Sequence, residues 1–220
     1  MNRGFIHIAV ACVVGFLALQ FEAQGAGTPL PFSDSFDTYG MGATPGSPWT
    51  TNGTGTAKVT NAPTPASGAQ LCDVSDLDLV LDVDESSGNY TNVYWLFYTQ
   101  PVRYDDENGA SPPTNFTGAA AAFYVTTNGG VKAYRNNTTN EWYLLAGANT
   151  VPSNTWVGFR IQVRYGASYD IFMTTNGYGT TMSQVGSSLN LPSTASNKMS
   201  DVAVYNTFKI DAVSLYLPPA

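Results

Sequence analysis

Side chains that perform acid–base chemistry or bind transition metals are scarce in this sequence. Its one histidine, His7, lies in an apolar N-terminal run that we interpret as a leader. Once such a leader is removed no imidazole remains, which excludes Ser-His-Asp triads, Cys-His pairs and His-ligated zinc. The glutamates after residue 25 are Glu85, Glu107 and Glu141, and they lie far apart in the sequence. Paired glutamates are therefore not indicated.

Four aspartates offer another source of paired carboxylates. Asp76, Asp78, Asp82 and Asp84 alternate with leucine and valine. Residues two apart on a strand share a face about 6.5–7 Å apart, and a retaining glycosidase needs carboxyls about 5–5.5 Å apart, so a catalytic pair is permitted. We interpret the aspartates instead as the solvated face of a strand whose leucines and valines face a core.

Tyrosine, arginine and glutamine indicate a binding face. Sugars present apolar C–H surfaces and hydroxyl rims, so their sites combine aromatic rings with a few fork-like donors. Arg160, Gln162 and Arg164 alternate with apolar residues and so share the face away from the core. The predicted carbohydrate-binding residues are Tyr94, Tyr98, Gln100, Tyr134, Arg160, Gln162 and Arg164, with Trp142 at the border. The alternative is ordinary sheet packing, with the arginines paired to carboxylates.

Strands must position these residues. Residues 157–163 alternate between apolar and polar, a turn follows at 166–168 and residues 169–173 return, which predicts a hairpin. Residues 92–100 are apolar on both faces, typical of a strand inside a sheet or along a groove. Further strands are predicted at 32–37, 57–60, 76–84, 119–126, 131–135, 141–146, 180–185, 201–205 and 207–217, with loops at 103–118 and 186–200. This pattern predicts an all-β, antiparallel sandwich.

Residues 1–25 have the features of a signal peptide. Arg3 supplies the positive start, residues 5–21 are almost unbroken apolar, and Ala23-Gln24-Gly25 fits a small-x-small cleavage rule. The alternative is a membrane anchor that stays attached, although this run is at the short limit for a spanning helix. Cleavage would leave residues 26–220 as a single exported domain, extracellular, periplasmic or on the cell surface, with no membrane insertion.

The composition of the exported chain narrows its partners. Cleavage removes Cys12 and leaves Cys72, which we predict to be a buried thiol because Ala69, Leu71 and Val74 surround it. The alternative is an intermolecular disulfide. The net charge of −7 argues against binding to nucleic acid or to an anionic membrane surface.

Three segments together resemble the concanavalin A-like lectin and glucanase superfamily, in its LamG-like jelly-roll branch. They are Phe32-Ser33-Asp34-Ser35-Phe36-Asp37, residues 156–173, and Phe208-Lys209-Ile210-Asp211-Ala212-Val213-Ser214-Leu215-Tyr216. The resemblance spans residues 32–217 and implies a jelly roll whose first and last strands lie side by side. It also implies one structural calcium ion near the joined chain ends, for which Asp34 and Asp211 are the first candidate ligands and Asp37 ranks behind them.

The same resemblance argues against catalysis. Laminarinase-type members carry a Glu-x-Asp-x-x-Glu strand, and no segment here matches it. The basic and histidine motifs of jelly-roll alginate lyases are missing as well. We therefore predict a non-catalytic, lectin-like module that recognises an extracellular polysaccharide or glycoprotein.

Two other function classes stay open at this point. One is a structural or adhesive surface protein that binds another protein, which an exposed Cys72 would favour. The other is a glycosidase or lyase that uses Asp and Tyr. It would need two carboxyls, or a Tyr beside an Arg, converging in one groove.

Overall fold

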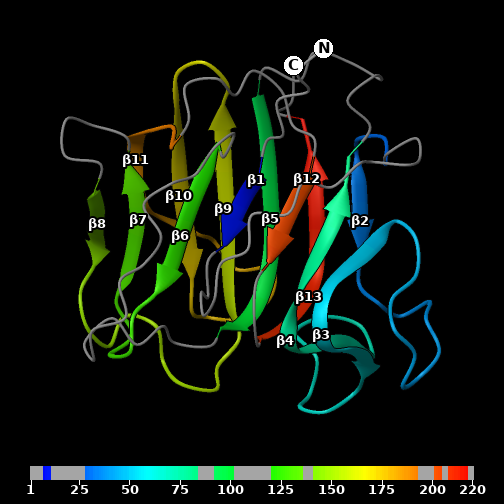
Figure 1. Ribbon diagram of the computed structural model, residues 1–220. Helices are drawn as coiled ribbons and strands as arrows, with labels where there is room; N and C mark the ends of the chain where they lie inside the picture. The colour runs from blue at the N-terminus through cyan, green and yellow to red at the C-terminus, as the bar shows by residue number, and fades with distance from the viewer. Residues whose placement is uncertain are drawn as a thin grey trace.

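The structure is a computed structural model that describes residues 7–10, 28–83, 92–101, 120–135, 141–192, 201–204 and 208–217. Every regular element in these ranges is a β-strand (Figure 1). The strands are β1 (His7–Val10), β2 (Phe32–Asp34), β3 (Trp49–Thr60), β4 (Leu71–Asp82), β5 (Asn92–Pro101), β6 (Ala121–Val125), β7 (Val131–Arg135), β8 (Glu141–Ala146), β9 (Val157–Arg164), β10 (Ser168–Thr174), β11 (Ser183–Asn190), β12 (Asp201–Val204) and β13 (Phe208–Tyr216).

The strands form one continuous sheet that folds over into two layers. The strand order is β11-β10-β9-β5-β13-β4-β12-β1-β6-β7-β8, with β2 beside β13 and β3 beside β4. In Figure 1, β11, β10, β9, β5 and β13 make a rear layer, and β4, β12, β1, β6, β7 and β8 make a front layer. The described pairings between strands are antiparallel except for those of β1, and the isolated bridge between Thr28 and Val83 is also parallel. The predicted all-β, antiparallel sandwich is confirmed.

The β3–β4 pair bends at the corner where the layers join. The first residues of β4 pair with β13 in the rear layer, and its last residues pair with β12 in the front layer. The register of β3 against β4 shifts between Gly53 and Thr56, and Asp76 has a φ of 55°. A Cβ on Gly55 would lie 1.8 Å from the carbonyl oxygen of Ser75. Only glycine permits this close approach, so Gly55 allows the bend.

Strands β2 and β13, the first and last strands of the segment that carries the resemblance, lie side by side, as the resemblance implied. Phe32 to Asp34 of β2 pair with Val213 to Leu215 of β13. Strand β13 shifts register against β5 between Asp211 and Ser214, and Ala212 has a φ of 50°. The shift lets one strand pair with β4 at its start and with β2 at its end.

The core lies between the two layers and is built by strict alternation. Phe159 and Ile161 of β9 are at most 1% exposed, whereas Arg160 and Gln162 between them are half-buried. The predicted β9–β10 hairpin is present, with Phe159 opposite Met173 and Ile161 opposite Ile171. A slip by one residue would place Arg160 in the core, so burial fixes this register.

Strand β1 comes from the segment predicted to be a leader. It lies between β12 and β6 and runs parallel to both. The signal peptide and the boundaries 1–25 and 26–220 therefore stay predictions, and the Discussion gives their test. The described residues include no helix long and apolar enough to cross a membrane.

Four predicted element boundaries are wrong. Strand β4 begins at Leu71 instead of residue 76. Strand β2 ends at Asp34, and Phe36 has a left-handed φ of 61° that turns its ring into the core rather than along a strand. Strand β3 runs from Trp49 instead of residue 57, because pairing with β4 orders a Thr- and Gly-rich segment. Strand β11 continues to Asn190, through residues predicted as loop. The predicted loop at 103–118 lies outside the described residues.

Candidate functional site

Four strands of the rear layer bring most of the predicted sugar-binding residues onto one outer face. Two neighbouring rows of the register cross β13, β5, β9 and β10. One row holds Tyr216, Tyr94, Gln162 and Asp170, and the next holds Ser214, Leu96, Arg160 and Phe172. These side chains are half-buried apart from Asp170, which is buried. The face is therefore accessible and carries both rings and polar groups.

A row of stacked flat groups runs across this face. The rings of Tyr216 and Tyr94 stack with centroids 5.2 Å apart and planes 14° apart. On the other side of Tyr94, the guanidinium of Arg160 lies 5.6 Å from that ring and 4.2 Å from the ring of Phe172. We call Tyr216, Tyr94, Arg160 and Phe172 the aromatic row. Sequence reasoning missed Tyr216 and Phe172, because only the pairing of β13 and β10 with their neighbours places them here.

The aromatic row limits what Tyr94 can contact. Tyr216 from β13 and Arg160 from β9 flank its ring on opposite sides, so neither ring face is open to stack on a sugar. The row instead offers hydroxyls and guanidinium N–H groups as hydrogen-bond donors, with the amide of Gln162 beside them in the register. Such an arrangement recognises the polar groups of a ligand.

Arg160 is held by rings rather than by a carboxylate. Within the described part of the chain its guanidinium makes no ion pair, and its buried Nε has no hydrogen-bond partner. Stacking on Phe172 and Tyr94 fixes the plane of the guanidinium, and no described carboxylate compensates its charge. An unpaired, pre-oriented cation on an accessible face is suited to binding an oxygen-rich ligand.

Arg164 is occupied by a structural contact. Its two terminal nitrogens donate to the Asp170 carboxylate at 2.8 and 3.0 Å, and it also donates to the hydroxyl of Ser168. Burial alone would raise the pKa of Asp170, but Arg164 and the backbone N–H of Ser188 hold it below its ordinary value. Arg164 therefore ties β9 to β10, and Asp170 in turn ties β10 to β11. This arrangement matches the alternative interpretation, in which the arginines pair with carboxylates.

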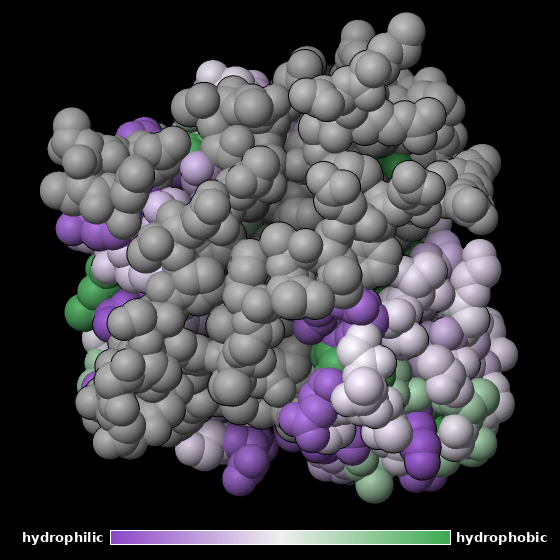
Figure 2. All heavy atoms as spheres, in the orientation of Figure 1, coloured by the Kyte–Doolittle hydropathy of each residue, from purple (hydrophilic) through white to green (hydrophobic). Residues whose placement is uncertain are grey.

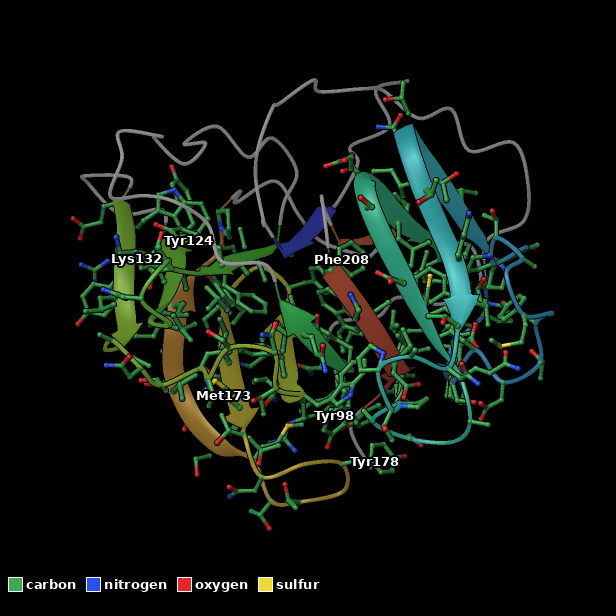
Figure 3. The ribbon with its side chains drawn as sticks, turned by 90° about the horizontal axis from the view of Figure 1, so that it is seen from below. Tyr98, Tyr124, Lys132, Met173, Tyr178 and Phe208 are labelled. Carbon is green, nitrogen blue, oxygen red and sulfur yellow. The ribbon has the colours of Figure 1, made fainter. Side chains whose placement is uncertain are left out.

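Tyr98 and Gln100 lie further along β5 from the aromatic row. The Tyr98 ring is 2% exposed, packs 5.0 Å from the ring of Tyr178, and its hydroxyl accepts the N–H of Gly179 (Figure 3). Tyr98 is therefore buried beneath the loop that carries Tyr178. Gln100 pairs in register with Lys209, whose ammonium lies 3.3 Å from the Asp73 carboxylate.

Tyr134 does not join the other predicted residues. It belongs to β7 in the front layer, is 2% exposed, and packs edge-on against Trp142 at 5.4 Å. Figure 3 shows the neighbouring front-layer residues Tyr124 and Lys132 on the opposite side of the sandwich from Tyr98. The core separates Tyr134 and Trp142 from Arg160, so their predicted place beside that face is wrong.

The two aspartates predicted to hold calcium act as hydrogen-bond acceptors. Asp34 accepts the backbone N–H of Phe36 at 2.7 Å, the indole N–H of Trp49 at 2.7 Å and the hydroxyl of Tyr39 at 3.0 Å. Asp211 is fully buried and accepts the N–H groups of Ser67 and Ala212.

These contacts fit calcium poorly, because donor hydrogens occupy the space around the carboxylate oxygens where a cation would bind. Asp37 likewise accepts the N–H groups of Ala69 and Gln70 at 2.8 Å. Among the described residues no group of three or more His, Cys, Asp or Glu side chains could hold a metal ion. Calcium stays a prediction, which chelation of the folded protein would test.

Cys72 is fully buried, as predicted. Burial, with the nearby Asp73 and Asp34 carboxylates, raises the pKa of its thiol to about 12. The thiol is thus both inaccessible and protonated, which makes it unsuited to an intermolecular disulfide.

No protein-family model matches the sequence, and no curated protein matches it either. Solved structures do share parts of the arrangement. Domain 4 of AbnA, an extracellular arabinanase of class GH43 from Geobacillus stearothermophilus solved with arabinotriose, matches with a TM-score of 0.46 at 15% identity, over 77% of this chain and 82% of that one.

Botulinum neurotoxin binding domains also match. The DC domain in complex with SialylT has a TM-score of 0.47 at 8% identity, over 76% of this chain, and the serotype G domain has 0.43 at 9%, also over 76%. This chain covers 42% and 43% of those two chains, so it spans less than half their length. The case for a function consequently comes from this chain's own residues.

Proposed function

We propose that this chain is an exported, non-catalytic carbohydrate-binding module of the concanavalin A-like type, and that it binds a polysaccharide or glycoprotein glycan on the outer face of the rear layer. The observation that carries the proposal is Arg160, a guanidinium without a carboxylate partner among the described residues, held between two rings. Tyr94, Tyr216 and Gln162 surround it with further hydrogen-bonding groups.

The charge balance of this face favours a glycan with acidic groups. Arg164 is neutralised by Asp170, and Lys209 by Asp73. Arg160, between the rings of Tyr94 and Phe172, has no carboxylate to neutralise it among the described residues. A carboxylate or sulfate that pairs with a pre-oriented guanidinium gains about 1.5–3 kcal/mol per hydrogen bond, so an acidic sugar unit is the best fit.

The test is binding of residues 26–220 to polygalacturonate, alginate and heparan sulfate, measured by calorimetry. We expect Arg160→Ala to weaken binding at least tenfold, which corresponds to about 1.4 kcal/mol. Arg160→Lys should recover only part of this loss, because an ammonium keeps the charge but not the planar fork. Lys58→Ala removes a cation from an exposed position on β3 and should bind as the wild type does.

Two outcomes count against the proposal. Wild-type affinity in Arg160→Ala would remove that residue from the site. A protein that melts cooperatively but binds no glycan would favour protein–protein adhesion instead. Adhesion through a disulfide is disfavoured already by the buried Cys72.

The enzyme alternative has one point in its favour, since Tyr94 lies beside Arg160. The guanidinium faces the ring of Tyr94, however, which is a packing contact. Activation of a tyrosine as a base would call for the cation beside the hydroxyl. Chromatography of each polysaccharide after incubation with the protein decides the matter, and we expect no cleavage products.

A further inference from the structure

A hollow lies at one side of the sandwich, where the two edge strands of the described sheet approach each other. Strands β8 and β11 are the last strands of the described sheet, and β11 contacts both β7 and β8. The hollow has a volume of about 450 Å³, within the range of small-ligand sites. Its front wall includes Arg135, Tyr143 and Leu144, and its rear wall includes Ser187, Ser188 and Asn190. We call it the edge groove.

The front wall presents an aromatic ring, that of Tyr143, which is held by the guanidinium of Arg135. Tyr143 and Leu144 are 44% and 52% exposed, and Figure 2 shows apolar atoms at the margin where Figure 1 places β8. The guanidinium of Arg135 lies 4.0 Å from the centroid of the Tyr143 ring, and Glu141 binds that guanidinium in turn. The guanidinium thus holds Tyr143 through one ring face, and the exposed part of the ring can contact the apolar face of a ligand.

The rear wall presents hydroxyls on a fixed strand. Ser187 and Ser188 are exposed, and the backbone N–H of Ser188 donates to the Asp170 carboxylate at 2.7 Å. Asp170 is itself held by Arg164, so the ion pair between β9 and β10 also positions this part of β11. The two walls therefore face each other on rigid strands, which reduces the entropy lost when a ligand binds.

The groove carries no net charge. Arg135 is the one charged residue among those that line it, and Glu141 neutralises it. This balance differs from the outer face, where Arg160 has no carboxylate partner among the described residues. An acidic sugar gains nothing here, whereas a neutral sugar ring matches an open aromatic face opposite a set of hydroxyls.

We propose that the edge groove is a second carbohydrate site, which binds one or two pyranose units of a neutral glycan. The C–H face of a sugar ring packs on Tyr143, and its hydroxyls bond to Ser187, Ser188 and Asn190. The site shares no ligand-contacting residue with the aromatic row, so each can be disabled separately.

The experiment is affinity electrophoresis of the full chain in gels that contain laminarin, galactomannan or xylan. We expect at least one of these neutral polysaccharides to retard the wild type. Tyr143→Ala should lower the affinity at least tenfold, and Ser187→Trp should do the same by filling the groove from the other wall. Tyr178→Ala is the matched control, because Tyr178 is also an exposed tyrosine, at 55% against 44% for Tyr143, and lies outside the groove. A cooperative melt of each variant establishes that it is folded.

The outcomes separate this inference from the proposed function. Retardation that Tyr143→Ala abolishes and Arg160→Ala preserves supports a second site. No retardation in any neutral gel overturns the edge groove, and so does retardation that Tyr143→Ala leaves unchanged or that only Arg160→Ala removes. Loss of binding to acidic polysaccharides in Arg160→Ala bears on the outer face alone.

Discussion

Arg160 and Arg164 lie on the same face of β9, and their partners give them different roles. Arg164 donates hydrogen bonds to Asp170 and Ser168. Arg160 contacts two aromatic rings and no carboxylate among the described residues. A sequence in which both arginines occupy equivalent positions of one alternation cannot separate them. The distinction arises from Asp170 and Phe172 on β10, whose places depend on the hairpin register.

Asp211 should make the stability of the protein depend on pH. Burial, with the nearby Asp37 carboxylate, raises its pKa from 3.8 to about 6, although the N–H groups of Ser67 and Ala212 act in the opposite direction. The folded state then binds an extra proton between about pH 4 and pH 6. The stability that this proton contributes is full below pH 4 and is lost as the pH rises through 6.

We expect the wild type to lose stability relative to Asp211→Asn by roughly 2–3 kcal/mol between pH 4 and pH 7, because the asparagine does not titrate. Urea unfolding at several pH values measures this difference. Asp76→Asn is the control, since Asp76 is exposed and asparagine tolerates its left-handed φ of 55°. A wild-type curve parallel to that of Asp211→Asn would show that folding does not raise the pKa of Asp211.

The β3–β4 corner is the element on which the two-layer fold depends, and Gly55 is its test. A Cβ at Gly55 would lie 1.8 Å from the Ser75 carbonyl, and backbone cannot move aside as a flexible side chain can. We expect Gly55→Ala to lower the free energy of unfolding by about 1–3 kcal/mol or more. Gly46→Ala, where nothing lies within 4 Å, should change it little. Urea melts of both variants decide, and equal midpoints would show that the corner relaxes easily.

Sequence patterns predict elements well where burial alone decides them. The β9–β10 hairpin and β5 alternate visibly, because one face of each meets the core. The first half of β3 and the end of β11 contain Thr, Gly and Ser without alternation, and only their partners order them as strands. The candidate sites follow the same rule. Arg160 and Gln162 were predictable from alternation, whereas Tyr216 and Tyr143 reach their sites through pairings between distant strands.

At the scale of the whole molecule, the predicted leader includes β1, which is a strand of the front layer. His7–Val10 lies between β12 and β6, so cleavage after residue 25 would take a strand out of that layer. The rear layer, the β3–β4 corner and the β2–β13 pair make no described pairing with β1. Both proposed sugar sites also lie away from it. We therefore expect residues 26–220 to fold without β1 and to retain both sites.

Hydrogen exchange can test this expectation directly. In residues 26–220, the amides of β6 and β12 that face β1 should exchange faster than in the full chain, because they lose their partners. The amides shared by β5 and β9 should be unchanged, because neither strand pairs with β1, and they serve as the internal control. A cooperative melt of residues 26–220 with this local change would agree with a removable leader. Failure of residues 26–220 to fold would mean that β1 is a permanent strand and that the signal-peptide interpretation is wrong.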